Sequence, residues 1–247
     1  MRRDHYQLDS PPLGRRIHLW VYGHFGQPIV VFPSAAGFAH EWEAQGMVAS
    51  LAPLLDGGRI KLYCPESNVS EAWTRQDADP AWRIQRHLAY ERFVLETLVP
   101  AVRADCRSET LPLATAGCSF GGFYAANFAL KQPETFRWAL CMSGRYEMTN
   151  FIGGYSSPEV YFNNPLAYVR GLEGAALERV RDNTSLSLVC GRGPWEEGCI
   201  EETLALADLL ADKGIPHERD IWGHDSAHQW NWWMRQAWHH LGRRFGG

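Results

Sequence analysis

The stretch LPLATAGCSFGGFYAANFALKQP, residues 111–133, indicates the fold class more clearly than any other part of the chain. It begins with an apolar run, passes through GCSFG and continues with apolar side chains at helical spacing, so it predicts a strand, a sharp turn and a helix. The five residues at the turn match G-x-S-x-G, the nucleophile elbow, in which the serine lies at a strained position and the glycines avoid clashes across the turn. Ser119 is therefore a candidate nucleophile at the carboxyl edge of a sheet.

The same turn predicts a site for an oxyanion. The amide of Phe120 falls in the first turn of the helix, where an unpaired N–H and the positive end of the helix dipole can face negative charge. The alternative interpretation is a glycine-rich turn with a capping serine. The strand before the motif and the helix after it favour the nucleophile.

The rest of the chain alternates between strand-like and helix-like segments. Residues 5–10 and 15–24 alternate polar and apolar side chains, which predicts an antiparallel hairpin at one edge of a sheet. Apolar runs predict buried strands at residues 27–34, 59–66 and 136–144, and the alternation of elements resumes with strands at 185–191 and 217–223. Amphipathic patterns predict helices at residues 43–55, 86–103, 199–213 and 230–245, and the second of these is expected to be broken only at Pro100.

This order of elements predicts an α/β fold, a mostly parallel sheet of about eight strands with helices on both faces. A ligand site is expected at the carboxyl ends of the strands. Residues 1–247 fit a single domain of this class. Residues 145–181, rich in Tyr, Phe, Asn, Gly and Pro, interrupt the alternation, and we expect them to form a cap or lid over the site.

The composition argues against several classes of function. The chain has 24 basic and 28 acidic residues without a long run of one sign, so nothing indicates a nucleic-acid or anionic-membrane partner. No stretch has the length and hydropathy of a secretion signal or a membrane span. The six cysteines are scattered without a C-x-x-C pair, which is typical of buried thiols in a reducing compartment. We therefore expect a cytoplasmic protein.

A serine hydroxyl needs a base to accept its proton and a carboxylate to orient that base. In the α/β-hydrolase arrangement these residues follow in the order serine, acid, histidine. The loop after residues 185–191 carries Glu196 and Glu197, and the loop after the next strand carries His224 and His228. Each has a simpler interpretation, since paired glutamates favour a helix dipole and loop histidines are usually solvated. Their order along the chain favours catalysis.

Five motifs together carry a resemblance that covers almost the whole chain. They are FPSAAG at residues 32–37, GCSFGG at 117–122, YFNNP at 161–165, GRGPWEE at 191–197 and WGHDSAHQWNWW at 222–233. The sequence resembles the serine esterases related to esterase D, S-formylglutathione hydrolase and the mycolyltransferases, and more closely a bacterial group of esterase-like proteins. The resemblance implies an α/β-hydrolase fold, cleavage of a small-molecule carboxylic ester through an acyl-enzyme, and no metal or organic cofactor.

The resemblance also implies roles for the base and the second oxyanion donor. In related esterases the catalytic histidine is followed by a tryptophan two residues on and then by a further aromatic residue. His228 with Trp230 fits this pattern, and His224 does not. By position Ala35 would supply the second oxyanion N–H, although its loop departs from the His-Gly pair common in such enzymes.

Two candidates remain for the acid. The pattern of the mycolyltransferases slightly favours Glu197, while the commoner spacing of three residues after Gly193 favours Glu196. Both are kept.

Aromatic residues crowd the same loops and the expected cap. Trp195, Trp230 and Tyr161 are candidates for substrate binding, and core or lid packing is the alternative for each. Two other functions remain open: an acyltransferase that uses the same triad, and a catalytically silent hydrolase fold that binds a ligand. The sequence does not decide between a monomer and a homo-oligomer.

Overall fold

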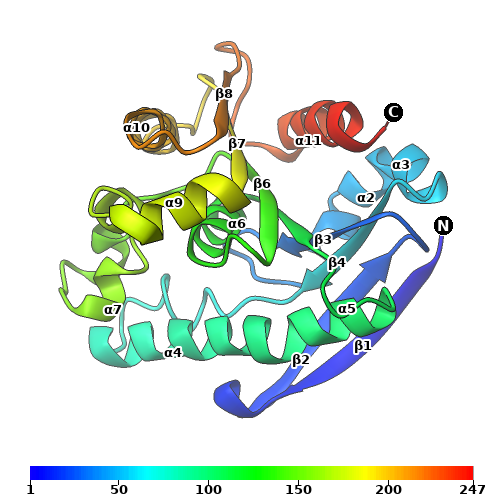
Figure 1. The fold of residues 1–247 in the computed structure, drawn as a ribbon, viewed down its shortest axis with the longest axis horizontal. Helices are drawn as coiled ribbons and strands as arrows, with labels where there is room; N and C mark the ends of the chain where they lie inside the picture. The colour runs from blue at the N-terminus through cyan, green and yellow to red at the C-terminus, as the bar shows by residue number, and fades with distance from the viewer. Residues whose placement is uncertain (247) are drawn as a thin grey trace.

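The structure, a computed structural model, describes residues 1–246 and is built around one eight-stranded sheet (Figure 1). The strands are β1 (Arg3–Ser10), β2 (Arg15–Tyr22), β3 (Gln27–Phe32), β4 (Ile60–Pro65), β5 (Leu113–Cys118), β6 (Phe136–Met142), β7 (Ser185–Cys190) and β8 (His217–Ile221). Their spatial order is β1-β2-β4-β3-β5-β6-β7-β8. The β1–β2 and β2–β4 pairs are antiparallel, and the other pairs are parallel. The predicted mostly parallel α/β sheet is therefore confirmed.

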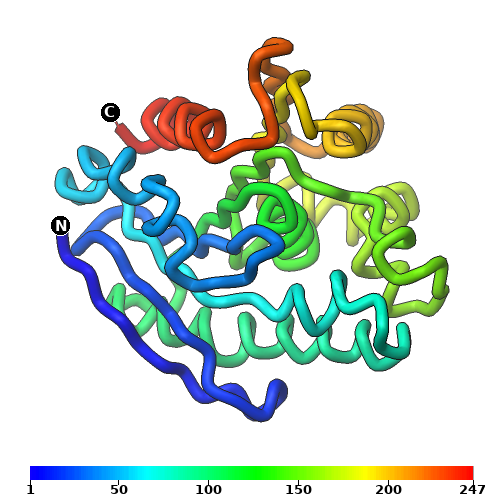
Figure 2. The backbone as a smooth tube through the Cα atoms, turned by 180° about the vertical axis from the view of Figure 1, so that it is seen from behind, coloured from blue at the N-terminus to red at the C-terminus, as the bar shows by residue number. Residues whose placement is uncertain are grey.

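The first two strands form the predicted antiparallel hairpin at one edge of the sheet. The alternating pattern of β2 buries Ile17, Leu19 and Val21 in the core. Figure 2 shows the hairpin (blue) at one edge of the molecule and the segment around β8 (orange) at the opposite edge.

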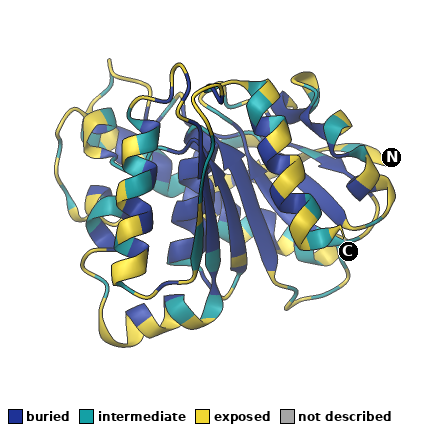
Figure 3. Cartoon of the chain, turned by 90° about the horizontal axis from the view of Figure 1, so that it is seen from above, coloured by how far each residue is buried: buried dark blue, intermediate teal, exposed yellow. Residues whose placement is uncertain are grey.

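Helices cover both faces of this sheet, as the sequence predicts, and the buried strands lie between them (Figure 3). One face carries α1 (Glu41–Ala44), α2 (Met47–Ser50), α3 (Ala52–Asp56) and α11 (Trp230–Phe245). The other face carries α4 (Pro80–Phe93), the π-helical η2 (Val94–Leu98), α5 (Val99–Asp105), α6 (Phe120–Lys131), α9 (Gly174–Asn183) and α10 (Cys199–Asp212). No helix within residues 1–246 is both long enough and apolar enough to cross a membrane.

The helix predicted at residues 43–55 is instead three short helices. Gly46 has a φ of 84°, which ends α1 and turns the chain into α2. Pro53 has no amide hydrogen to continue a helix, and it lies in the first turn of α3. The apolar spacing alone did not show these breaks.

The long helix predicted at residues 86–103 begins earlier and does not break at its proline. It starts at Pro80, where Asp79 accepts a hydrogen bond from the amide of Trp82 at 3.0 Å. The π-helical turn η2 directly precedes α5 and accommodates Pro100, which has no N–H to donate.

The segment 145–181 divides into two parts. Its first part contains η3 (Thr149–Ile152), α7 (Pro158–Tyr161) and α8 (Pro165–Tyr168). Its last part belongs to α9, which buries Leu177 and Val180 in the core and connects the parallel strands β6 and β7. The irregular segment therefore ends before α9, at residue 173.

Asn163, between α7 and α8, ties this irregular segment to the rest of the molecule. The residue is fully buried, and its Oδ1 atom accepts hydrogen bonds from His87 at 3.0 Å, Asn127 at 2.9 Å and Lys131 at 2.8 Å. The three donors lie on α4 and α6, so a single amide joins the segment to two helices of one face.

Candidate active site

Ser119 lies at the sharp turn between β5 and α6. Its φ of 56° and ψ of −124° are a strained conformation for a residue with a side chain. The amide of Ser119 donates to the carbonyl oxygen of Met142, at the end of the neighbouring strand β6, at 2.9 Å. The turn expected from the sequence is thus present. Ser119 is partly exposed at the carboxyl edge of the sheet.

The glycines of this turn leave no room for a side chain. A Cβ atom at Gly117 would lie 2.2 Å from the carbonyl oxygen of Gly121. A Cβ atom at Gly121 would lie 2.2 Å from the carbonyl oxygen of Phe32, at the end of β3. Close backbone packing therefore explains the spacing of the motif and brings the elbow against the loop that follows β3.

An acid and a base meet on the loops that follow β7 and β8. The Nδ1 atom of His228 lies 3.1 Å from the Oε2 atom of Glu196. The Glu196 side chain is 1% exposed and that of His228 is 20% exposed, so the carboxylate is buried while the imidazole reaches solvent. A carboxylate in this position accepts the Nδ1 proton and leaves Nε2 as the free, basic nitrogen.

Of the two candidate acids, Glu196 is the one that contacts His228 within residues 1–246. Trp195 adopts a φ of 69°, and the chain then turns so that Glu196 is buried and Glu197 is exposed. The amide of Ile200 donates to the carbonyl oxygen of Glu196 at 2.9 Å and fixes this orientation at the start of α10. A sequence pattern cannot distinguish which of two consecutive glutamates points inward.

Four loops at the same edge of the sheet carry the polar groups of the site. Because β5, β6, β7 and β8 are neighbours and parallel, the residues that follow them emerge side by side. Ser143 follows β6 directly, and its hydroxyl donates to Glu196 Oε1 at 2.6 Å. The sequence analysis did not single out Ser143. Its position directly after the strand at residues 136–142, between the loops of Ser119 and Glu196, could have indicated a place in the site.

The structure does not join Ser119 and His228 by a hydrogen bond among the described residues. Catalytic hydrogen bonds are often long in ligand-free enzymes and shorten when substrate binds. What the structure brings together is the acid with the base, and the serine with the end of β6 that leads to Ser143.

Two backbone amides are available near the nucleophile. Within residues 1–246, neither the Ala35 amide nor the Phe120 amide donates a hydrogen bond to another group of the chain. Phe120 is the first residue of α6, and Ala35 is on the loop after β3, which the elbow contacts through Gly121. Both are therefore free to donate to a ligand.

Glu41 holds the loop that carries Ala35. Its Oε2 atom accepts from the Ser34 amide and its Oε1 atom from the Ser34 hydroxyl, each at 2.6 Å. Burial raises the pKa of the Glu41 carboxyl, and the hydrogen bonds from Ser34 oppose this. The loop is thus fixed by a buried acid that follows it in sequence.

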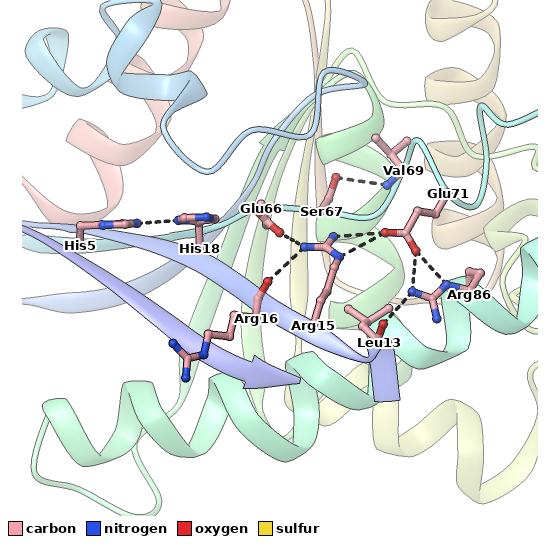
Figure 4. A network of polar contacts seen from close by, with 10 residues as sticks. All are labelled: His5, Leu13, Arg15, Arg16, His18, Glu66, Ser67, Val69, Glu71 and Arg86. Carbon is pink, nitrogen blue, oxygen red and sulfur yellow. Dashed lines mark hydrogen bonds and ion pairs between the residues drawn. The ribbon is translucent and has the colours of Figure 1, made fainter. Parts of the chain in front are cut away.

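A network of ion pairs holds the next loop, which follows β4 (Figure 4). Arg15 pairs with Glu66 and Glu71, and Arg86 of α4 pairs with Glu71 at 2.6 Å. The amide of Ser67 donates to the carbonyl oxygen of Gly37 at 3.0 Å. The network therefore fixes a loop that lies against the end of the Ala35 loop.

The three aromatic candidates differ in their surroundings. Trp195 is 73% exposed and Tyr161 is 41% exposed. Trp230 is partly buried and packs edge to face on Trp233, with ring centroids 5.1 Å apart. Trp195 and Tyr161 are thus free to contact a ligand, while Trp230 supports its neighbour.

A cavity of about 770 Å³ lies elsewhere, at the amino ends of the strands, where Lys61 and Gly26 line it.

Two groups of side chains have the composition of metal ligands. In the first, Cys199 Sγ lies 3.8 Å from His228 Nδ1 beside Glu196. Burial raises the pKa of the Cys199 thiol to about 12. In the second group, Asp220, His239 and His240, the Asp220 carboxylate is already bonded to His240 at 3.0 Å.

The Esterase family model matches residues 13–242. The chain belongs to the Esterase family. This membership makes the chain a carboxylic ester hydrolase, as the sequence resemblance implied. A comparison with curated protein sequences found no match.

Solved structures similar to this esterase share its fold at low sequence identity. A ferulic acid esterase is 16% identical with a TM-score of 0.74, over 99% of this chain and 97% of that one. The Staphylococcus aureus fluorophosphonate-binding serine hydrolase F is 15% identical with a TM-score of 0.76, over 98% and 97%. Mycobacterium tuberculosis MPT51 is 15% identical with a TM-score of 0.73, over 100% and 98%. The predicted α/β-hydrolase fold is therefore confirmed.

Proposed function

We propose that this esterase cleaves small-molecule carboxylic esters through an acyl-enzyme, with Ser119 as nucleophile, His228 as base and Glu196 as the acid that orients the base. The observation that carries the proposal is the 3.1 Å contact between His228 Nδ1 and the buried carboxylate of Glu196, on loops that emerge beside the serine elbow. The three residue types occur in the order serine, acid, histidine that this fold uses.

In the first half of the reaction, Ser119 Oγ attacks the ester carbonyl carbon while His228 Nε2 takes the hydroxyl proton. The tetrahedral intermediate collapses, the bond to the alkoxy oxygen breaks, and His228 returns the proton to the departing alcohol. In the second half, His228 takes a proton from water while the water oxygen attacks the acyl carbon. The bond from the acyl carbon to Ser119 Oγ then breaks, and His228 returns the proton to Oγ, which releases the acid and restores Ser119. Glu196 keeps the Nδ1 proton in place and stabilises the imidazolium that forms twice per turnover.

The amides of Phe120 and Ala35 are proposed to bind the oxyanion. Their support is that both N–H groups lack a partner in residues 1–246 and that the elbow packs against the loop of Ala35. A donor of this kind typically stabilises the transition state by about 3 kcal/mol. Since the donors are backbone groups, the absence of a His-Gly pair does not remove them.

Trp195 and Tyr161 are proposed to contact the substrate, and Trp230 to shape the site through Trp233. We propose that residues 145–173 form the cap of a single domain. The exposed aromatic side chains suit an apolar or planar group on the ester.

All six cysteines are free thiols, which supports the proposal of a reducing, cytoplasmic compartment.

A fluorophosphonate probe and a series of nitrophenyl esters of increasing acyl length test the proposal. We expect covalent labelling and ester hydrolysis in the wild type, and neither in Ser119→Ala. A folded wild-type sample without labelling would instead favour a silent binding protein. Product release that accelerates when alcohols are added, with transesterified product, would favour an acyltransferase.

A further inference from the structure

Ser143 and Trp233, which lie outside the proposed triad, close a ring of contacts around its acid and base. Trp233 Nε1 donates to Ser143 Oγ at 3.0 Å, and Ser143 Oγ donates to Glu196 Oε1 at 2.6 Å. Glu196 Oε2 lies 3.1 Å from His228 Nδ1, and the His228 ring packs on the Trp233 ring. We propose that Ser143 and Trp233 are positioning residues that fix the geometry of the acid–base pair.

The chemistry of the groups decides the direction of each hydrogen bond. An indole N–H only donates, and an ionised carboxylate only accepts. The Ser143 hydroxyl must therefore accept a hydrogen bond from Trp233 and donate its one proton to Glu196 Oε1. One carboxylate oxygen thus receives the Ser143 hydroxyl. The other receives the Nδ1 proton of His228 and also the thiol of Cys190, at 3.4 Å.

Trp233 acts on the base as well as on the acid. Its ring centroid lies 4.7 Å from that of His228, with an interplanar angle of 83°, which is a favourable edge-to-face arrangement. Trp233 is 4% exposed and packs in the core from α11. A rigid side chain therefore holds the plane of the imidazole while Glu196 holds one of its nitrogens.

The backbone of Ser143 supports a role for its side chain. Ser143 is fully buried and has a φ of 47°, a conformation in which glycine is the least strained residue. Its amide donates to Val189 at 2.7 Å, which anchors the strained residue at the end of β7. A residue that keeps a hydroxyl where glycine would fit better indicates that the hydroxyl has a function.

The inference rests on the proposed triad, so its test compares kcat, KM and pH profiles for a nitrophenyl ester in variants that remain folded. Ser143→Gly removes the hydroxyl and also relieves the strained φ. A loss of activity in this variant can therefore be told apart from a loss of stability caused by backbone strain. Ser143→Ala removes only the hydroxyl, and Trp233→Phe keeps an aromatic edge against His228 without the N–H. Hydrogen bonds to charged groups of this strength correspond to about a 10- to 100-fold change in rate.

The chain contains a matched control pair in the same sheet. Trp138 Nε1 donates to Ser187 Oγ at 3.2 Å between β6 and β7, and both residues are buried away from the triad. Ser187→Ala therefore removes an equivalent buried tryptophan–serine hydrogen bond without touching Glu196. We expect its kcat and pH profile to match the wild type.

For Ser143→Gly and Ser143→Ala we expect kcat to fall about 10- to 100-fold with KM unchanged. The pH profile of kcat/KM should also differ from that of the wild type, because Glu196 no longer receives the hydrogen bond from Ser143. Ser143→Gly should melt no lower than Ser143→Ala, because both lose the hydroxyl and glycine alone relieves the strained φ. Trp233→Phe should show a smaller change of the same kind.

A folded Ser143→Gly variant with wild-type kcat and a wild-type pH profile would overturn the inference, as would an equal loss of rate in Ser187→Ala. These outcomes differ from failure of the proposed function, in which the wild type is not labelled by a fluorophosphonate or Ser119→Ala keeps full activity.

Discussion

Glu41 accepts two hydrogen bonds from Ser34, one from its amide and one from its hydroxyl, each at 2.6 Å. This contact fixes the loop of Ala35 with a carboxyl group whose pKa burial raises. Because the folded pKa exceeds the unfolded one, folding favours the protonated carboxyl. The stability that Glu41 contributes is therefore present at low pH and is lost as pH rises through the raised pKa.

The first prediction concerns the pH dependence of stability. Between pH 4 and pH 8 the melting temperature of the wild type should fall more steeply than that of Glu41→Gln, which carries no ionisable group at this position. Thermal melts at several pH values check this, and parallel curves for the two proteins would contradict it.

The second prediction separates the two adjacent glutamates. Glu196→Gln should lower kcat by about 10³- to 10⁴-fold, as expected when the residue that orients a catalytic imidazole loses its charge. Glu197→Gln is the matched control, since Glu197 is exposed, and its kcat should stay within about two-fold of the wild type. The reverse order of effects would restore Glu197 as the acid.

The third prediction concerns the glycines of the elbow. Gly121→Ala should lower the free energy of unfolding by about 3 kcal/mol, because the added carbon meets the carbonyl oxygen of Phe32 and the backbone must move. Gly242→Ala, in α11, places its carbon in open space and should raise the free energy of unfolding by about 0.5–1 kcal/mol. Urea unfolding measures both, and equal effects would show that the elbow can relax.

The fourth prediction concerns the link between the cap segment and the helices beneath it. Asn163→Ala leaves the donors of His87, Asn127 and Lys131 without their shared acceptor and should cost about 3 kcal/mol or more. Asn183→Ala, which removes an exposed hydrogen bond at the end of α9, should change stability by less than about 0.5 kcal/mol. A neutral Asn163→Ala would mean that water replaces the amide.

Most of the sheet was predictable because buried parallel strands are continuous apolar runs with turns at their ends. The runs before Ser34, Ser119 and Gly191 each form a strand of the sheet, and the loops after them carry the candidate site. The breaks within residues 43–55 were not predictable, since Gly46 and its φ of 84° depend on how the chain packs beneath α11.

The candidate site was predictable in its residue types and less so in its geometry. The order of serine, acid and histidine follows from the chain, but the inward turn of Glu196 depends on the backbone at Trp195. Ser143 was missed because its role depends on contacts with Glu196 and Trp233, which lie far from it in the sequence. Contacts between residues distant in sequence are what the sequence pattern leaves out.

The strand order also bears on how this enzyme can be handled. All four loops of the candidate site leave the carboxyl edge of the sheet, whereas Gly26 and Lys61 line a surface at the opposite, amino edge. A surface attachment or a fused tag placed on that opposite edge would leave the carboxyl edge, which carries the candidate site, unobstructed. Immobilising the enzyme by its amino edge is therefore the orientation that the architecture recommends.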